Sequence, residues 1–344
     1  MTASVQINDI LVPLKGKRLR FGSHEYLLRE PIATGPFSSV FLVEEDGVPY
    51  AMKVEAQNGC LRPVLKLDHA VLSALGSQTG FPSLVSSGRT DHFKYVVMQL
   101  VGPDLSMLLE FAPNNRFSTS TVYKIALQTL QRLRVLHDAG WLNRDVKAQN
   151  FAVGLAEESG IVYMLDFGLT RRYLEQDGRP HLLRPWGPSV GTFPYAPLSS
   201  LGFCDQTPSD DVEGWLYMVI HLLTGGLPWH NSQRSLNLAK VREWKMYCRR
   251  AGGRHHLFQG VPQGWVDVFE EICRTAKHAR PDYSKIANMV ISIAQQEKIN
   301  LQEPFDWQVL PVLRSLVRLG PLSCDELTAQ VGTPRANRIV VSPV

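Results

Sequence analysis

Apolar and polar positions alternate in short runs between residues 25 and 100, and this pattern predicts a lobe made mainly of β-strands. Asp46-Gly47 is a typical hairpin turn between two of these runs. One helix is predicted from Pro63 to the residue before Gly76, because apolar residues recur there at helical spacing. The predicted strands cover residues 26–32, 38–44, 48–54, 84–87 and 95–100.

Beyond Gly102-Pro103 the apolar positions recur with a helical period. The longest predicted helix runs from Ser118 to Ala139, with Ser118 or Thr119 as its N-cap and Gly140 at its end. Further helices are predicted at 211–223, 237–250, 265–277 and 283–296, and a short strand at 162–165. A small strand-rich lobe followed by a larger helical lobe predicts an α+β chain, and ligands commonly bind between such lobes.

Composition narrows the class of protein. Hydrophobic residues make up 44% and charged residues 20% of the 344 residues, which excludes disorder over the whole chain. The net charge of +4 is too small to indicate a nucleic-acid or membrane-surface protein, and the basic residues from Lys240 to Arg250 fit a solvated helix face. The five cysteines form no CxxC pair, which favours unpaired thiols in a reducing compartment. Since no secretory or membrane-spanning run is present, we expect a cytoplasmic protein, with the nucleus as a second compartment.

The loop after the long helix carries the strongest chemical signal, Asn143-Arg144-Asp145-Val146-Lys147-Ala148-Gln149-Asn150. The spacing of Asp145 and Asn150 suits phosphoryl transfer, because a carboxylate can accept the proton of a hydroxyl nucleophile while an amide oxygen ligates Mg²⁺. Taken alone, this stretch could equally be a polar loop with a capping Asp. Asp166-Phe167-Gly168 follows a predicted strand further on, and a carboxylate at a strand end is well placed for Mg²⁺. Each motif is weak by itself, but both in this order indicate a phosphoryl-transfer site.

Two features of the strand-rich lobe favour the same chemistry. Lys53 ends the β-type run Tyr50-Ala51-Met52-Lys53 and could hold phosphate oxygens, although a lone Lys at a strand edge usually faces solvent. Asp68 lies beside the apolar face of the predicted helix and could pair with Lys53, the alternative being a surface Asp. Residues 32–40 are similar to a glycine-rich phosphate loop in which only Gly35 remains of the usual three glycines.

In this order, these motifs resemble those of eukaryotic protein kinases over residues 25–296. Finer motifs resemble the casein kinase 1 group, and within it the tau-tubulin kinases. They are Val64-Leu65-Lys66-Leu67-Asp68, Tyr95-Val96-Val97-Met98-Gln99-Leu100, Asn150-Phe151-Ala152, Tyr163-Met164-Leu165-Asp166-Phe167-Gly168-Leu169, Gly191-Thr192, Leu227-Pro228-Trp229, Pro281-Asp282-Tyr283 and Phe305-Asp306-Trp307.

The resemblance implies a bilobal protein kinase fold, with an N-lobe at 25–101 and a mainly helical C-lobe at 102–300. Residues 1–24 would form an N-terminal arm, and residues 301–344 a C-terminal extension with a flexible end. ATP and Mg²⁺ would be the cofactors and proteins the substrates. The kinase domain would be monomeric, with no nucleic-acid or membrane partner.

The resemblance also implies roles for individual residues. Asp145 would be the catalytic base, Lys147 would neutralise the γ-phosphate, and Lys53, paired with Asp68, would hold the α- and β-phosphates. Asn150 and Asp166 would hold Mg²⁺, and Asp211 would anchor the catalytic loop. The nucleotide site would comprise the gatekeeper Met98, the backbone of Gln99 and Val101 against adenine, Gly35 in the phosphate loop, and Ile32, Val40, Ala51, Ala152 and Leu165 around the base.

Several residues depart from the family pattern. Ala33 and Ser38 replace the outer glycines of the phosphate loop, which stiffens it. Asp68 replaces a Glu and is one methylene shorter, and Asn143 replaces the His of His-Arg-Asp. Pro194 replaces an Arg that helps to bind phosphate on primed or acidic substrates. Basic residues remain nearby in sequence, and we interpret them as part of a solvated loop: Arg171, Arg172, Arg179 and Arg184. The expected function is a serine/threonine kinase, and the alternative is a pseudokinase that binds nucleotide or acts as a scaffold.

Overall fold

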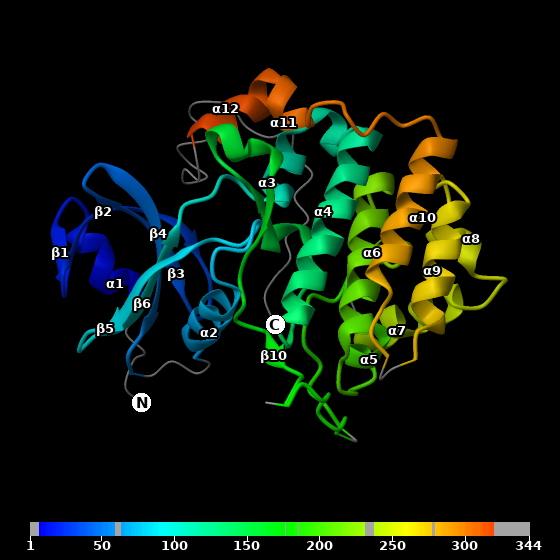
Figure 1. Ribbon diagram of the computed structural model, residues 1–344, viewed down its shortest axis with the longest axis horizontal. Coiled ribbons are helices and arrows are strands. Elements are labelled where there is room, and N and C mark those ends of the chain that lie inside the picture. Colours follow the sequence, from blue (N-terminus) through cyan, green and yellow to red (C-terminus); the bar gives the residue numbers. More distant parts are fainter. Residues whose placement is uncertain are drawn as a thin grey trace.

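The computed structural model describes residues 7–58, 63–175, 177–184, 186–230, 237–276 and 279–319. Figure 1 shows a lobe containing a curled sheet and helix α2 (Leu65–Leu75) beside a larger lobe of helices. The chain crosses between them after β6 (Phe93–Gln99) and enters the large lobe at α3 (Leu105–Phe111). The α+β, two-lobed architecture that the hydrophobic pattern predicts is therefore confirmed.

The small lobe contains a six-stranded sheet in the order β1-β2-β3-β4-β6-β5, with every neighbouring pair antiparallel. Alternate side chains point into a common core, where Phe41, Val43 and Met52 are fully buried. The predicted strands agree with the observed ones to within a few residues. Besides β6, the strands are β1 (Arg18–Phe21), β2 (His24–Thr34), β3 (Ser39–Glu45), β4 (Val48–Ala56) and β5 (Leu84–Arg89).

Residues 7–21, within the predicted arm, form three elements that the hydrophobic pattern does not indicate. They are α1 (Ile7–Leu11), a 3₁₀ turn (Val12–Leu14) and β1, and each is too short to show a period. Strand β1 pairs with β2, and Leu11 is fully buried in the same core as Tyr26. The sheet therefore begins at Arg18. That the domain itself begins at residue 25 stays a prediction.

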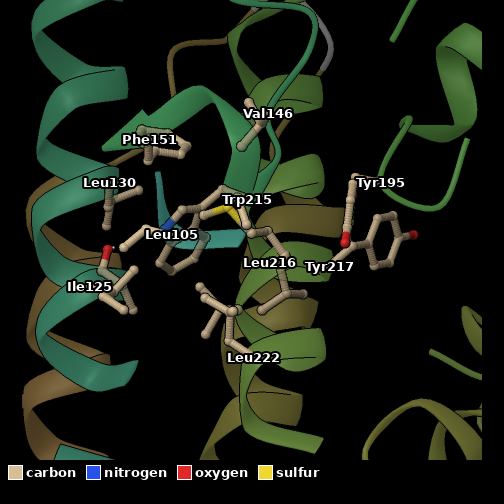
Figure 2. Packing of buried hydrophobic residues seen from close by; sticks show 14 of the residues in the cluster. Leu105, Ile125, Leu130, Val146, Phe151, Tyr195, Trp215, Leu216, Tyr217 and Leu222 are labelled. Carbon is tan, nitrogen blue, oxygen red and sulfur yellow. Dashed lines mark hydrogen bonds between the residues drawn. The ribbon is translucent and has the colours of Figure 1, made fainter. Parts of the chain in front are cut away.

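The large lobe is organised around α6 (Pro208–Thr224), which packs against α4 (Thr119–Asp138) and α9 (Gly264–Arg274). Figure 2 shows Trp215 and Leu216 of α6 among the apolar side chains of this core, near Ile125 and Leu130 of α4. The indole N–H of Trp215 donates to Thr129 Oγ1 at 3.0 Å, so even the polar atom of this buried ring is satisfied.

The other elements of the large lobe are mostly short. Further helices before residue 300 are α5 (Leu198–Leu201), α7 (Leu238–Cys248), α8 (Arg254–Leu257) and α10 (Tyr283–Gln296). A short hairpin joins β8 (Phe151–Val153) to β9 (Val162–Met164), and β7 (Trp141–Leu142) pairs antiparallel with β10 (Arg171–Arg172) further along the chain. The 3₁₀ turns are Pro113–Asn115, Ala148–Asn150 and Ala156–Gly160.

Capping residues determine where the two main helices begin. Ser118 Oγ accepts the N–H of Thr121 at 3.2 Å, which confirms the predicted cap of α4. Helix α6 begins at Pro208, before the predicted Asp211, because Thr207 and Asp210 form a capping box.

Part of the predicted C-terminal extension packs firmly on the large lobe, as α11 (Asp306–Val309) and α12 (Pro311–Leu319). Asp306 accepts both the N–H and the hydroxyl of Ser118 at 2.6 Å, and the indole N–H of Trp307 donates to Ser159 O at 2.7 Å. Residues 320–344, for which a flexible end is predicted, lie outside the described residues. Among the described residues, none of the helices combines the length and apolarity that a membrane crossing requires.

Candidate active site

Lys53, Asp68 and Asp166 come together from three separate elements. Lys53 lies within the central strand β4, Asp68 in the first turn of α2, and Asp166 two residues after the end of β9. Lys53 Nζ lies 2.8 Å from Asp68 Oδ2 and 2.9 Å from Asp166 Oδ1. The predicted Lys53–Asp68 pair is therefore present, and the shorter Asp side chain does reach the lysine.

Burial and charge act in opposite directions on this network. Burial alone would lower the pKa of Lys53, but the neighbouring Asp166 and Asp68 carboxylates outweigh it and raise that pKa. The Lys53 charge lowers the pKa of Asp166 to about 2, whereas burial raises the pKa of Asp68. Asp166, whose side chain is 53% exposed, thus stays ionised and accessible near neutral pH.

Asp68 also holds the chain next to Asp166. Its Oδ1 accepts the N–H of Phe167 at 3.0 Å, and the buried Phe167 ring stacks on Phe81 with centroids 6.3 Å apart. Asp166 has a left-handed backbone with φ of 55°, which is uncommon for a residue other than glycine. Helix α2 therefore fixes the orientation of Asp166 as well as that of Lys53.

Thr192 and Lys147 make the two shortest contacts to the Asp145 carboxylate. Thr192 Oγ1 donates to Asp145 Oδ1 at 2.8 Å, and Lys147 Nζ lies 2.7 Å from Oδ2. Lys147 also donates to Thr192 Oγ1 at 3.2 Å, so the three side chains form a closed triangle. Thr192 belongs to a loop distant in sequence, and only the fold brings it to Asp145.

Asn150 and Asp166 are joined through the short β8–β9 hairpin. The amide nitrogen of Asn150 donates to the Asp145 carbonyl at 2.8 Å and to its carboxylate at 3.2 Å, which orients the side chain. The N–H of Leu165 donates to Asn150 O at 2.8 Å, so the residue before Asp166 is bonded directly to Asn150. The two predicted magnesium ligands are thereby brought to one place.

Asp211 anchors the loop that carries Asp145, as the resemblance implies. Its two carboxylate oxygens accept the N–H groups of Asn143 and Arg144, both at 2.7 Å. Asn143 Oδ1 in turn accepts the N–H of Asp145 at 3.0 Å. The Asn that replaces the family's His therefore supports the catalytic loop directly.

His137 completes this anchor, and sequence reasoning missed it. The ring is fully buried at the end of α4, with Nε2 2.8 Å from Asp211 Oδ2 and Nδ1 hydrogen-bonded to the Tyr283 hydroxyl. Its one signal in the sequence is its position four residues after Leu133, which continues the apolar face of α4.

The residues predicted around a nucleotide base lie on both sides of the lobe connection. In the sheet, Ala51 pairs with Met98 and Val40 with Lys53. In the large lobe, Val101, Ala152 and Leu165 pack in one apolar cluster. Gln99 is fixed by its N–H, which donates to Ser83 O at 2.9 Å, and by its side chain, which donates to Glu158 at 2.9 Å.

The predicted phosphate loop forms a tight, exposed turn between the end of β2 and the start of β3, just after Ile32. Ala33 pairs with Val40 and Thr34 with Ser39, so the strands continue to residues 34 and 39. Gly35 N–H donates to Ser38 O at 2.9 Å across the turn. Ala33, which stands where the family has a glycine, is thus paired within the sheet. This pairing agrees with the stiffer loop that Ala33 and Ser38 predict.

Arg171 and Arg184 depart from the expectation of a solvated basic loop. Both pair with the carboxylate of Asp205, whose side chain is 2% exposed, at 2.6 Å and 2.7 Å. Burial opposes the charge on Asp205, yet the hydrogen bonds from Arg184 and Arg171 lower its pKa well below the usual range. These two arginines therefore tie the segment after Asp166 to the start of α6.

In this two-lobed fold, a lysine of the sheet and a carboxylate on a loop of the helical lobe form a site of the kind that enzymes use for phosphoryl transfer. A family model described as "Protein kinase domain" matches residues 26–291, and the chain belongs to this family. It is also 41% identical over 287 residues to the Caenorhabditis elegans protein named serine/threonine-protein kinase spe-6. That alignment covers 83% of this chain and 76% of the relative.

Proposed function

We propose that this protein is an active serine/threonine kinase, which transfers the γ-phosphoryl group of ATP to serine and threonine hydroxyls of protein substrates. The observation that carries the proposal is the Asp145 carboxylate, held at 2.8 Å by Thr192 and at 2.7 Å by Lys147. A carboxylate fixed in this way is poised to accept a hydroxyl proton. The kinase named spe-6 supports the same activity, and neither comparison favours the pseudokinase alternative.

In this mechanism each residue of the site has one task. Asp145 orients the substrate hydroxyl and accepts its proton as the bond to phosphorus forms. Lys147 offsets negative charge on the transferred group, while Lys53, held by Asp68, binds the α- and β-phosphates. Met98, the backbone of Gln99 and Val101, and the apolar side chains of Ile32, Val40, Ala51, Ala152 and Leu165 would enclose the adenine, with Gly35 over the phosphates.

The site also fits a magnesium ion. Asp166 remains ionised because Lys53 lowers its pKa to about 2, and Asn150 turns its amide nitrogen toward Asp145, which leaves its oxygen for a cation. Carboxylate and amide oxygens are hard ligands of the kind that Mg²⁺ prefers. When bound, the ion would neutralise phosphate charge.

The finer assignments belong to the same proposal. The motifs Asn150-Phe151-Ala152 and Phe305-Asp306-Trp307 favour the casein kinase 1 group, near the tau-tubulin kinases. We propose a monomeric catalytic domain at 25–300, working in the cytoplasm and the nucleus on protein substrates without nucleic-acid or membrane partners.

One experiment tests the function. The full chain is incubated with labelled ATP, Mg²⁺ and dephosphorylated casein, beside Asp145→Ala and Lys53→Ala variants. We expect label transfer by the wild type that both substitutions abolish. Absence of transfer, together with a thermal shift by Mg-ATP that Lys53→Ala removes, would instead establish a nucleotide-binding pseudokinase. Absence of both transfer and shift would leave a scaffold.

A further inference from the structure

Among the described residues, no lysine or arginine is more deeply buried than Lys245 of α7. Its side chain has no exposed surface, and Nζ donates to the carbonyl of Ala196 at 2.5 Å and to that of Phe193 at 3.4 Å. The ammonium also lies 4.4 Å from the ring centre of Tyr217 and 4.9 Å from that of Trp229. Carbonyl oxygens and aromatic faces thus surround it.

This position is costly for a charge. Burial lowers the pKa of Lys245 to about 7, and among the described residues no carboxylate lies within ion-pair distance of it. The nearby Glu213 is already bonded to Arg249 at 2.6 Å and to the Tyr217 hydroxyl at 2.7 Å. An apolar side chain would fill the space at lower cost, so the lysine needs a reason beyond packing.

That reason lies in the loop above it, residues 191–196. Trp229 Nε1 donates to Pro194 O at 2.9 Å, so Trp229 and Lys245 together hold the carbonyls of residues 193, 194 and 196. On its other side the loop touches the catalytic loop: a Cβ at Gly191 would meet Arg144 O at 2.7 Å. Thr192 of the same loop donates to Asp145.

We propose that Lys245 and Trp229 form a clamp that positions the 191–196 loop for binding protein substrate, through the hydrogen bond from Thr192 to Asp145. Lys245 is a positioning residue, because it touches neither Asp145 nor Lys53 in the network described above. The inference rests on the proposed kinase function and adds a determinant of protein-substrate binding to it. Nucleotide binding depends on other residues and does not need the clamp.

Steady-state kinetics of the full chain with dephosphorylated casein and ATP test the clamp. Lys245→Met keeps the length of the side chain but loses the donor, and we expect its KM for casein to rise about tenfold while its KM for ATP stays within about twofold. Lys245→Arg, which keeps a charged donor, should recover part of the loss. The matched control is Lys240→Met, an exposed lysine on the same helix, which should behave as the wild type.

A second variant covers the case in which Lys245→Met does not fold. Trp229→Phe keeps an aromatic ring but removes the donor to Pro194 O, and should raise the KM for casein in the same direction. A purely structural role would instead lower the melting temperature and kcat and leave the KM for casein unchanged. That result, or unchanged kinetics in both variants, would overturn the proposal.

Hydrogen exchange separates this inference from the kinase proposal. Peptides covering residues 190–198 should exchange about tenfold faster in Lys245→Met and Trp229→Phe than in the wild type and Lys240→Met. If the wild type fails to phosphorylate casein but exchange still accelerates, the kinase proposal fails and the clamp on the loop is supported. Exchange that is identical in all four proteins would overturn the clamp whatever the activity.

Discussion

Asp68 bonds Lys53 and Phe167 at the same time: one carboxylate oxygen lies 2.8 Å from the lysine ammonium and the other accepts the Phe167 N–H at 3.0 Å. A side chain one methylene shorter than Glu therefore serves both the sheet and the segment after β9. Helix α2 lies close enough to β4 for the shorter Asp68 side chain to reach Lys53. A carboxylate on a shorter side chain requires this position of the helix.

The first prediction concerns this double contact. Asp68→Asn removes the ion pair and should lower kcat/KM for ATP by about tenfold or more, because hydrogen bonds to charged groups contribute about 1.5–3 kcal/mol. Phosphorylation of casein at varied ATP concentration measures it. The exposed Asp91→Asn serves as the control, and turnover of Asp68→Asn at the wild-type rate would mean that the pair is dispensable.

A second prediction concerns Asn143, whose Oδ1 accepts the N–H of Asp145 at 3.0 Å in a buried position. Asn143→Ala leaves that N–H unpaired, at a cost of about 1–3 kcal/mol. We expect kcat to fall about tenfold while the KM for ATP stays within about twofold, because the lost contact lies beside the catalytic base Asp145 and away from Lys53. Unchanged kcat in a fully folded variant would contradict the supporting role of Asn143.

A third prediction concerns the extension that follows α10. Asp306 accepts two hydrogen bonds from Ser118 at the start of α4, so Asp306→Ala should lower the free energy of unfolding by about 2–3 kcal/mol. Urea unfolding followed by circular dichroism measures the change. Asp267→Ala, an exposed aspartate in the first turn of α9, should lose far less. Equal losses in the two variants would show that the hydrogen bonds of Asp306 to Ser118 add nothing to stability.

A fourth prediction concerns pH and His221, whose Nδ1 lies 2.6 Å from the Tyr195 hydroxyl. Burial, with a smaller contribution from His230, lowers the pKa of His221 to about 4, below the value of about 6.5 in an unfolded chain. The native state thus disfavours protonation. The contribution of His221 to the free energy of unfolding is complete above about pH 6.5 and is lost as the pH falls toward 4, by about 3 kcal/mol.

Unfolding experiments across this pH range test the His221 prediction. The free energy difference between wild type and His221→Gln should be constant above about pH 6.5 and should shrink as the pH falls toward 4. The exposed His92→Gln should follow the wild type at every pH. A difference that stays constant down to pH 4 would show that His221 does not titrate in this range.

Local patterns were sufficient to place most of the chemistry. The spacing of Asp145, Asn150 and Asp166, with Lys53 upstream, predicts the two ends of the site from the sequence alone. Helix α10 matched its predicted bounds because its apolar period is regular and Asp282 caps it. These features depend on neighbours in sequence, which a single sequence displays.

Contacts between segments distant in sequence cannot be predicted from such local patterns. The sequence does not indicate that His137 meets Asp211, and it predicts a solvated loop for Arg171 and Arg184, which instead pair with Asp205. Lys245 stands in a basic stretch that favoured a solvated helix face, yet its side chain is fully buried. Nothing in the local sequence distinguishes a buried lysine from an exposed one.

The sequence by itself determined the two lobes, the order of the motifs and the residue types needed for phosphoryl transfer, because periodicity and spacing are local properties of the chain. Only the tertiary structure decided which partners hold them. Thr192 became the partner of Asp145, His137 the partner of Asp211, and Lys245 a donor beneath the 191–196 loop, because each pair joins elements that chain folding alone brings within hydrogen-bond distance.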